Sequence, residues 1–181
     1  KEHGMTLKLG ILASGSGTNA QAMIDAVESG KLDAEICVII ANRPGAKVLD
    51  LFGGTGQLGI EAKSRGAGEV VIVDLARDSV KLIKENVEYC KLDCKVVQAD
   101  AISYLHGCGS FDLIFIDPPY DSDLAEKALK TIKEIDILSE GGIIVCETRK
   151  ETPTPELEAP YKKRKEYTYG KIKLSVYTKE S

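Results

Sequence analysis

Short apolar runs alternate with longer amphipathic stretches along almost the whole chain. Several runs are apolar at consecutive positions, as in 113–116 and 143–145, which is typical of parallel strands covered on both faces. The pattern therefore predicts an α/β fold in which helices cover a mostly parallel sheet, with Asp78 and Asp123 as N-caps of two helices. The expected strands are residues 7–13, 35–41, 47–52, 69–74, 95–98, 111–117 and 142–147, and the expected helices are residues 19–29, 56–65, 78–90 and 123–135.

The pattern of apolar and polar residues changes after residue 147. Three prolines interrupt regular structure, and two strand-like segments, 165–169 and 171–177, then flank Gly170. Because glycine allows a tight turn between paired strands, these segments predict a C-terminal antiparallel β-hairpin.

One connection between expected strands is very short. Only residues 42–46 separate the strand at 35–41 from the strand at 47–52. A parallel crossover needs about a dozen residues or more, so these two strands cannot be parallel neighbours. Either they run antiparallel or the first lies elsewhere, and in both cases the pattern indicates a discontinuity near residue 46.

A glycine-rich loop follows the strand at 47–52 and precedes a helix. Glycines at 53, 54 and 56 permit a tight turn and close backbone approach to a ligand, and a helix N-terminus favours negative charge. Such loops bind nucleotides, nicotinamide cofactors and S-adenosylmethionine alike. A purely structural strand–helix turn is the alternative.

Acidic residues end the next two expected strands. Asp74 lies 24 residues after Asp50, where a Rossmann-type site places an acid that accepts hydrogen bonds from ribose hydroxyls. Asp100 follows the strand at 95–98, and its carboxylate would suit an adenine amino group. Each acid alone could equally cap a helix. Because ligands of open α/β sheets bind at the carboxyl ends of strands, the two acids together indicate a nucleoside site.

The tetrapeptide Asp117-Pro118-Pro119-Tyr120 follows the strand at 111–117. The two prolines make a stiff turn and remove two backbone donors, so acceptors dominate locally. An exocyclic base amine is a poor nucleophile, and an acid and a carbonyl that accept its N–H groups would point its lone pair at a methyl donor. An aromatic ring can stack on an extruded base. The alternative is a rigid surface turn.

Residues 47–181 resemble the RsmD-like family of small-subunit ribosomal RNA guanine-N2 methyltransferases. The likeness rests on residues 48–62, 64–67, 111–120 and 169–177. It implies a Rossmann-like, S-adenosylmethionine-dependent methyltransferase sheet, mostly parallel, with a C-terminal antiparallel hairpin. It also implies that Asp117, Pro118, Pro119 and Tyr120 position the guanine amine. The residues that the resemblance assigns to S-adenosylmethionine are Asp50, Phe52, Gly53, Gly54, Thr55, Gly56, Asp74, Leu75, Asp100 and Ala101.

The first 46 residues resemble a different family. Residues 5–46 are similar to the start of glycinamide ribonucleotide formyltransferases, in which a phosphate would be held by Gly15, Ser16, Gly17, Thr18 and Asn19. The Arg-Pro-Thr element with which the RsmD-like family begins is absent. We therefore expect a chimera joined near Ala46, with a βαβ-like segment at 1–46 and a methyltransferase domain at 47–181. The first segment could add edge strands to the sheet, dock its helix on the sheet, or exchange with a second molecule to give a segment-swapped dimer, and the sequence leaves these alternatives open.

Net charge and the number of cysteines further limit the possible functional classes. With 24 basic and 28 acidic residues the net charge is −4, so no global field attracts a polyanion, although residues 161–181 hold seven basic residues against two acidic ones. That excess could contact phosphates or guard a strand edge. Five cysteines without framework spacing predict buried thiols rather than a metal site. No apolar run approaches the roughly 20 residues of a membrane helix, and a cytoplasmic protein is expected.

Three functional hypotheses remain open from the sequence. The first is methylation of guanine N2 in small-subunit (16S) ribosomal RNA. The second is an adenine-N6 nucleic-acid methyltransferase, because Asp-Pro-Pro-Tyr serves those substrates too. The third is a catalytically impaired chimeric scaffold that at most binds the cofactor.

Overall fold

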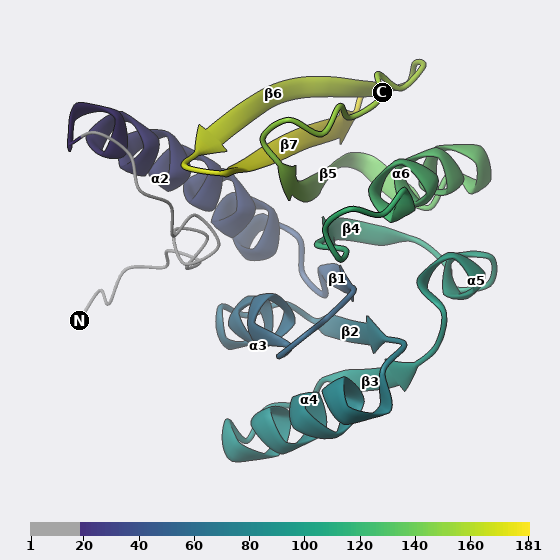
Figure 1. The fold of residues 1–181 in the computed structure, drawn as a ribbon. Coiled ribbons are helices and arrows are strands. Elements are labelled where there is room, and N and C mark those ends of the chain that lie inside the picture. Colours follow the sequence, from purple (N-terminus) through teal and green to yellow (C-terminus); the bar gives the residue numbers. More distant parts are fainter. Residues whose placement is uncertain (1–18) are drawn as a thin grey trace.

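Residues 19–181 form a seven-stranded sheet with helices on both faces (Figure 1). The computed structural model describes the backbone of residues 19–181 and the side chains of residues 30–181. The strand expected at 7–13 and four of the five predicted phosphate-binding residues, Gly15 to Thr18, lie outside the described residues. Asn19 is the first residue of a helix.

The strand order in the sheet is β3-β2-β1-β4-β5-β7-β6. Strands β1 to β5 are parallel neighbours, whereas β7 pairs antiparallel with both β5 and β6. This confirms the predicted mostly parallel sheet with a C-terminal hairpin. The strands are β1 (Lys47–Leu51), β2 (Glu69–Asp74), β3 (Lys95–Gln98), β4 (Phe111–Ile116), β5 (Leu138–Arg149), β6 (Tyr161–Tyr169) and β7 (Ile172–Lys179).

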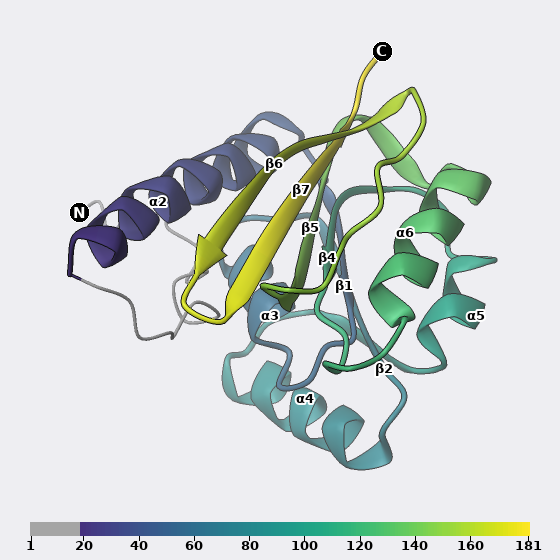
Figure 2. The same cartoon turned by 45° about the horizontal axis from the view of Figure 1, so that its top comes forward.

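Helices cover the two faces of the sheet unequally (Figure 2). Helices α2 (Asn19–Asn42), α3 (Gln57–Ser64) and α4 (Arg77–Tyr89) lie on one face, and α5 (Ala101–Leu105) and α6 (Leu124–Ile135) lie on the other. Neighbouring residues of one strand enter opposite cores, as Leu113 and Ile114 of β4 do. Burial on both faces explains why the parallel strands are apolar at consecutive positions.

The strand predicted at residues 35–41 is wrong, because this segment is the second half of α2. Its β-branched residues favour a strand locally, but Leu32, Ile36, Ile39 and Ile40 recur at helical spacing and are buried in one core. Residues 43–46 therefore join a helix to β1, which is an ordinary length for such a loop. The crossover problem that indicated a discontinuity near residue 46 does not arise.

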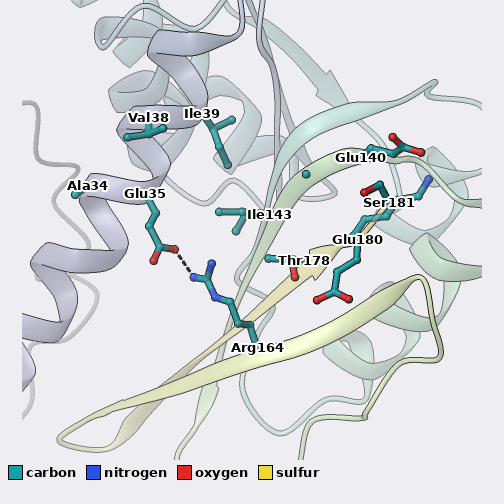
Figure 3. Close-up of a pocket in the computed structure, with 12 residues that line it drawn as sticks. Ala34, Glu35, Val38, Ile39, Glu140, Ile143, Arg164, Thr178, Glu180 and Ser181 are labelled. Atoms are coloured by element: carbon teal, nitrogen blue, oxygen red, sulfur yellow. Dashed lines mark hydrogen bonds and ion pairs between the residues drawn. The ribbon is translucent and has the colours of Figure 1, made fainter.

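Helix α2 is held to the sheet by polar contacts as well as by apolar burial. Arg43, just after the helix, donates to Asp112 Oδ1 at 2.8 Å and to the Glu140 carbonyl at 2.7 Å. Glu35 forms an ion pair with Arg164 of β6 across a cavity of about 730 Å³ between the helix and the hairpin (Figure 3). The helix is thus attached both to the central strands and to the hairpin.

Two smaller predictions on helices also need correction. Asp78 does not cap α4, since the N-cap position belongs to Ala76 and Asp78 lies in the first turn. Asp123 does occupy the N-cap position of α6, but its side chain makes no capping hydrogen bond and pairs with Lys127 at 2.9 Å. The short helix α5 was not predicted. Within residues 19–181 no helix has the length and apolarity needed to cross a bilayer.

Candidate active site

A cavity of about 780 Å³ opens at the carboxyl ends of the parallel strands. It spans the point where the strand order reverses between β1 and β4, which is where open α/β sheets bind ligands. Its size is within the range of ordinary small-molecule sites, about 300–1,000 Å³. The predicted residues that line it are Phe52, Gly54, Asp74, Leu75, Asp100, Ala101, Asp117, Pro118, Pro119 and Tyr120.

The glycine loop reaches the cavity through a turn that needs left-handed backbone. Phe52, Gly54 and Gly56 have φ values of 65°, 62° and 80°. The Gly53 amide donates to the Val73 carbonyl at 2.7 Å, which holds the loop against β2. Of the loop residues, Phe52 and Gly54 line the cavity, whereas Gly53, Thr55 and Gly56 are not among its lining residues.

Asp74 organises the loop that surrounds it. Its Oδ2 accepts a hydrogen bond from the Gly54 amide at 2.9 Å, and its Oδ1 accepts one from the Ala76 amide, also at 2.9 Å. A carboxylate has about four lone-pair sites, so each oxygen can still accept from a ribose hydroxyl. Leu75 beside it is 65% exposed, an unusual position for a large apolar side chain, and faces the cavity.

Asp100 both caps a helix and lines the cavity. Its Oδ2 accepts from the Ser103 amide at 2.9 Å at the start of α5, and this hydrogen bond lowers the pKa of the Asp100 carboxyl. The cap and the ligand-binding interpretations were alternatives in the sequence. The structure brings Asp100 and Ala101 to the same cavity as Asp74.

Asp50 lies beneath the loop and not in the cavity wall. It is 1% exposed, and its Oδ2 accepts from the Gly59 amide of α3 at 3.0 Å. Burial raises the pKa of Asp50 to about 8, and the carboxyls of Asp117 and Asp74 add to the rise. Asp50 therefore supports the turn into α3 from below.

The segment 117–120 forms the wall opposite Asp74. The Ser122 hydroxyl donates to the Pro119 carbonyl at 2.7 Å and stabilises the turn after Tyr120. The Tyr120 ring is 45% exposed, and Arg149 lies over it with Cζ 5.1 Å from the ring centroid. Pro118 is buried, which helps to fix the turn. The Tyr120 ring is therefore presented next to a rigid segment of backbone.

Glu147 is a site residue that the sequence reasoning missed. It lines the cavity, is 5% exposed, and its Oε1 accepts from the Tyr120 hydroxyl at 3.0 Å. Asp117 and Glu147 directly follow Ile116 and Cys146, which are paired between β4 and β5. Burial raises the pKa of both carboxyls, that of Glu147 to about 8, and each carboxyl affects the pKa of the other. The missed signal was an acid directly after the apolar run 143–146, the same pattern that identified Asp74 and Asp117.

The donor set of the cavity fits a nucleoside cofactor such as S-adenosylmethionine. Acceptors at two strand ends, Asp74 and Asp100, flank the exposed apolar side chain of Leu75, and Gly54 has open space where a Cβ would stand. Within residues 30–181 no group of three or more His, Cys, Asp or Glu side chains is arranged to hold a metal ion.

The basic excess at the C-terminus is largely neutralised within the fold. Lys162, Lys163, Arg164 and Lys179 all form ion pairs with acidic side chains. The Lys173 ammonium donates to the Thr152 carbonyl at 2.5 Å. Most of these cations therefore stabilise the hairpin, which agrees with the strand-edge interpretation more than with a phosphate-binding patch.

Comparisons with known proteins place this geometry in a family. The family described as Conserved hypothetical protein 95 matches residues 34–178. YlbH of Bacillus subtilis is 35% identical over 141 residues, which cover 75% of this chain and 77% of that protein. The Ribosomal RNA small subunit methyltransferase D of Escherichia coli (strain K12) is 29% identical over 138 residues, covering 75% and 70%. A solved structure from Haemophilus influenzae gives a TM-score of 0.75 at 27% identity and covers 83% of this chain and 87% of its own.

The family match begins at residue 34, within α2, and so extends before the join expected near Ala46. It continues through the whole parallel sheet, the candidate active site and nearly all of the hairpin. This confirms the resemblance of the C-terminal three quarters. The chain belongs to the RsmD-like family described as Conserved hypothetical protein 95.

Proposed function

We propose that this protein is an S-adenosylmethionine-dependent methyltransferase that acts on the exocyclic N2 amine of a guanine in small-subunit ribosomal RNA. The observation that carries the proposal is the meeting, in one cavity, of two strand-end acids, Asp74 and Asp100, with the segment 117–120. The relative from Escherichia coli is named a ribosomal RNA small subunit methyltransferase, which supports the substrate class.

The residues after β2 and β3 hold the cofactor in this proposal. Asp74 accepts hydrogen bonds from the ribose hydroxyls, and Asp100 accepts one from the adenine amino group. Leu75 offers its exposed apolar side chain to the adenine ring. When bound, S-adenosylmethionine supplies an electrophilic methyl group on a sulfonium centre.

The segment after β4 prepares the amine. The lone pair of a guanine N2 amine is delocalised into the ring, so the amine needs acceptors on its N–H groups before it becomes nucleophilic. The Asp117 carboxyl accepts one N–H, and a backbone carbonyl of the proline turn accepts the other. The exposed Tyr120 ring stacks on the extruded base, where stacking contributes about 1–3 kcal/mol.

Two alternatives use the same cavity. An adenine-N6 amine has the same need for two acceptors and a stacking surface. A chain that binds the cofactor without methylating RNA would follow if the first 46 residues displace RNA-contacting elements. We propose that the residues before the family match at residue 34 derive from a formyltransferase-like protein, so that the join lies earlier than the position near Ala46 expected from the sequence. The phosphate site at residues 15–19 and the cytoplasmic location stay predictions, and the segment-swapped dimer stays one of the alternatives for the first segment.

Methyl transfer to small ribosomal subunits that lack the modification tests the proposal. We expect incorporation of labelled methyl groups at a guanine N2, located by mapping the modified base. Asp117→Ala should abolish most of this transfer, while calorimetry should show a cofactor affinity within about threefold of wild type. The reason is that Asp117 is proposed to contact the target guanine and not the nucleoside part of S-adenosylmethionine. Incorporation at an adenine would favour the second hypothesis, and cofactor binding without any transfer would favour the impaired scaffold.

A further inference from the structure

We propose that Glu147 is a positioning residue of the methyl-transfer site, which holds Asp117 and Tyr120 in place through one proton shared between two carboxyl groups. The inference rests on the proposed function, because Asp117 and Tyr120 are the groups proposed to receive the target base. Glu147 itself needs no contact with the substrate.

The contacts of Glu147 tie it to two groups from a different loop. It lies near the carboxyl end of β5, whereas Asp117 and Tyr120 follow β4, the neighbouring strand. The Tyr120 hydroxyl donates to Glu147 Oε1 at 3.0 Å. Asp117 is beside Glu147 because the residues before them, Ile116 and Cys146, are paired between the two strands, and the two carboxyls affect each other's pKa. One nearly buried side chain therefore fixes both the acceptor and the stacking surface of the segment 117–120.

The arrangement requires a proton between the carboxyl groups. Ionised carboxylates have only acceptor atoms, so a hydrogen bond between Asp117 and Glu147 forms only if one of them is protonated. The Oε2 atom of Glu147 is buried, and no donor within residues 30–181 reaches it. A negatively charged Glu147 would leave that oxygen desolvated and unpaired, which is costly. A shared proton removes this cost.

Glu147 is the partner that carries the proton. Burial raises its pKa to about 8, with the negative charge of Asp117 as the second cause. Burial also raises the pKa of Asp117, and the interaction with Glu147 offsets part of that rise by favouring the ionised form of Asp117. Because the pKa values of both carboxyls are raised, the pair retains a proton near neutral pH. The inference assigns this proton to Glu147, which leaves Asp117 with lone pairs for the N–H of an amine.

Other charged groups nearby are engaged elsewhere. Arg149, on the same strand, pairs with Asp121 at 3.2 Å, and the Lys173 ammonium of β7 donates to the Thr152 carbonyl. Asp50 of β1 is held by the Gly59 amide, and the pKa of the buried Cys146 thiol is raised to about 12, so the thiol stays neutral. Asp117 and Tyr120 are therefore the groups that act on Glu147.

The inference predicts a loss of turnover at alkaline pH. When Glu147 loses its proton near pH 8, two negative carboxylates face each other and repel, which displaces Asp117. A small displacement of an orienting group can lower a rate by about 10²-fold. The turnover number should fall above about pH 8, with little change in cofactor affinity.

Two variants of the full chain test the inference. Glutamine mimics the protonated acid, because its amide donates to Asp117 and its carbonyl accepts from Tyr120, but it cannot ionise. We expect Glu147→Leu to lower kcat at neutral pH by about 10²-fold, and Glu147→Gln to recover most of that loss without the alkaline decline. Equal loss in both variants, or an alkaline decline that persists with glutamine, would overturn the inference.

A second readout does not depend on activity. Carboxyl ¹³C NMR of the protein labelled at Asp and Glu should show one glutamate that titrates near pH 8 and is absent from Glu147→Gln. A Glu147 signal that titrates in the usual glutamate range would refute the shared proton even if no RNA substrate is found. If wild type binds S-adenosylmethionine but methylates no RNA while the NMR signal is present, the proposed function fails and the carboxyl pair stands.

Discussion

Asp74 and Asp100 each accept hydrogen bonds from nearby backbone amides while they line the cavity. Asp74 connects the glycine loop to the start of α4, and Asp100 fixes the first turn of α5. Acceptors that are already fixed need little reorganisation when a ligand arrives. For Asp100 the helix-cap and ligand-binding interpretations are therefore compatible, because the hydrogen bond that caps α5 also fixes the carboxylate.

We expect Asp74→Ala to weaken S-adenosylmethionine binding by about 1–3 kcal/mol, because ribose hydroxyls would be buried without an acceptor. Isothermal titration calorimetry measures the effect. The matched control is Asp78→Ala, which removes an exposed carboxylate four residues later that does not line the cavity. Equal affinities of wild type and Asp74→Ala would remove Asp74 from the site.

Gly59 allows α3 to pack close to β2. A Cβ at Gly59 would stand 2.7 Å from Ile72 Cγ1 and 3.2 Å from Val70 Cγ1, which is too close for stiff β-branched side chains in a strand. Gly59→Ala should destabilise the protein by about 1–3 kcal/mol in urea unfolding, despite the better helix propensity of alanine. Gly30→Ala should stabilise it by about 0.5–1 kcal/mol, because Gly30 lies in α2 with nothing within 4 Å. The same sign for both variants would contradict the packing argument.

For single residues, the sequence locates the acids at the ends of strands, but it does not predict the role of a residue whose contacts come from another strand. Asp74, Asp100 and Asp117 could be located because each ends an apolar run. The role of Glu147 depends on the register between β4 and β5, which brings it to Tyr120. Asp50 directly precedes the glycine loop in the sequence and was assigned to the cofactor with it. Its actual position beneath the loop depends on the hydrogen bond from the Gly59 amide, which no local sequence pattern reveals.

Among the elements, α2 shows most clearly why local patterns are insufficient. Its second half contains enough β-branched residues to predict a strand, yet four apolar side chains meet one core only at helical spacing. Burial against β4 and β6 outweighs the local preference. The parallel strands were predicted well because burial on both faces makes them continuously apolar, a pattern that propensity and packing both support.

The helical interpretation of α2 predicts different effects for two neighbouring residues. Ile36 is fully buried, whereas Val38 is 56% exposed. Ile36→Ala should destabilise the protein by about 2–4 kcal/mol through the cavity it leaves, and Val38→Ala should change stability by less than about 0.5 kcal/mol. Urea unfolding followed by circular dichroism measures both. A small effect at Ile36 would mean that α2 does not share the core of the sheet.

Across the described part of the molecule, three buried acids have raised pKa values. Asp50 and Glu147 have pKa values raised to about 8, and Asp33 of α2 has a value raised to about 7, in each case mainly by burial. These groups bind protons in the folded protein that they release in the unfolded chain near neutral pH. Stability therefore depends on pH through these buried acids, of which Glu147 also lines the cavity.

The sign of this dependence follows from the raised values. Between the unfolded pKa values near 4 and the folded values near 7 to 8, the folded state holds more protons, so stability falls as pH rises. Each such group contributes at most about 1.4 kcal/mol per pH unit within that window. The acids with lowered pKa values, such as Asp112 and Asp136, are already ionised in both states above about pH 5 and do not offset the fall in stability.

We therefore expect the urea midpoint to decrease from about pH 5 to about pH 8. Asp50→Asn should reduce this slope, because asparagine can still accept the hydrogen bond from the Gly59 amide but cannot ionise. A slope unchanged by Asp50→Asn would mean that Asp50 is already ionised in the folded protein, and that the fall with pH arises at Asp33 and Glu147.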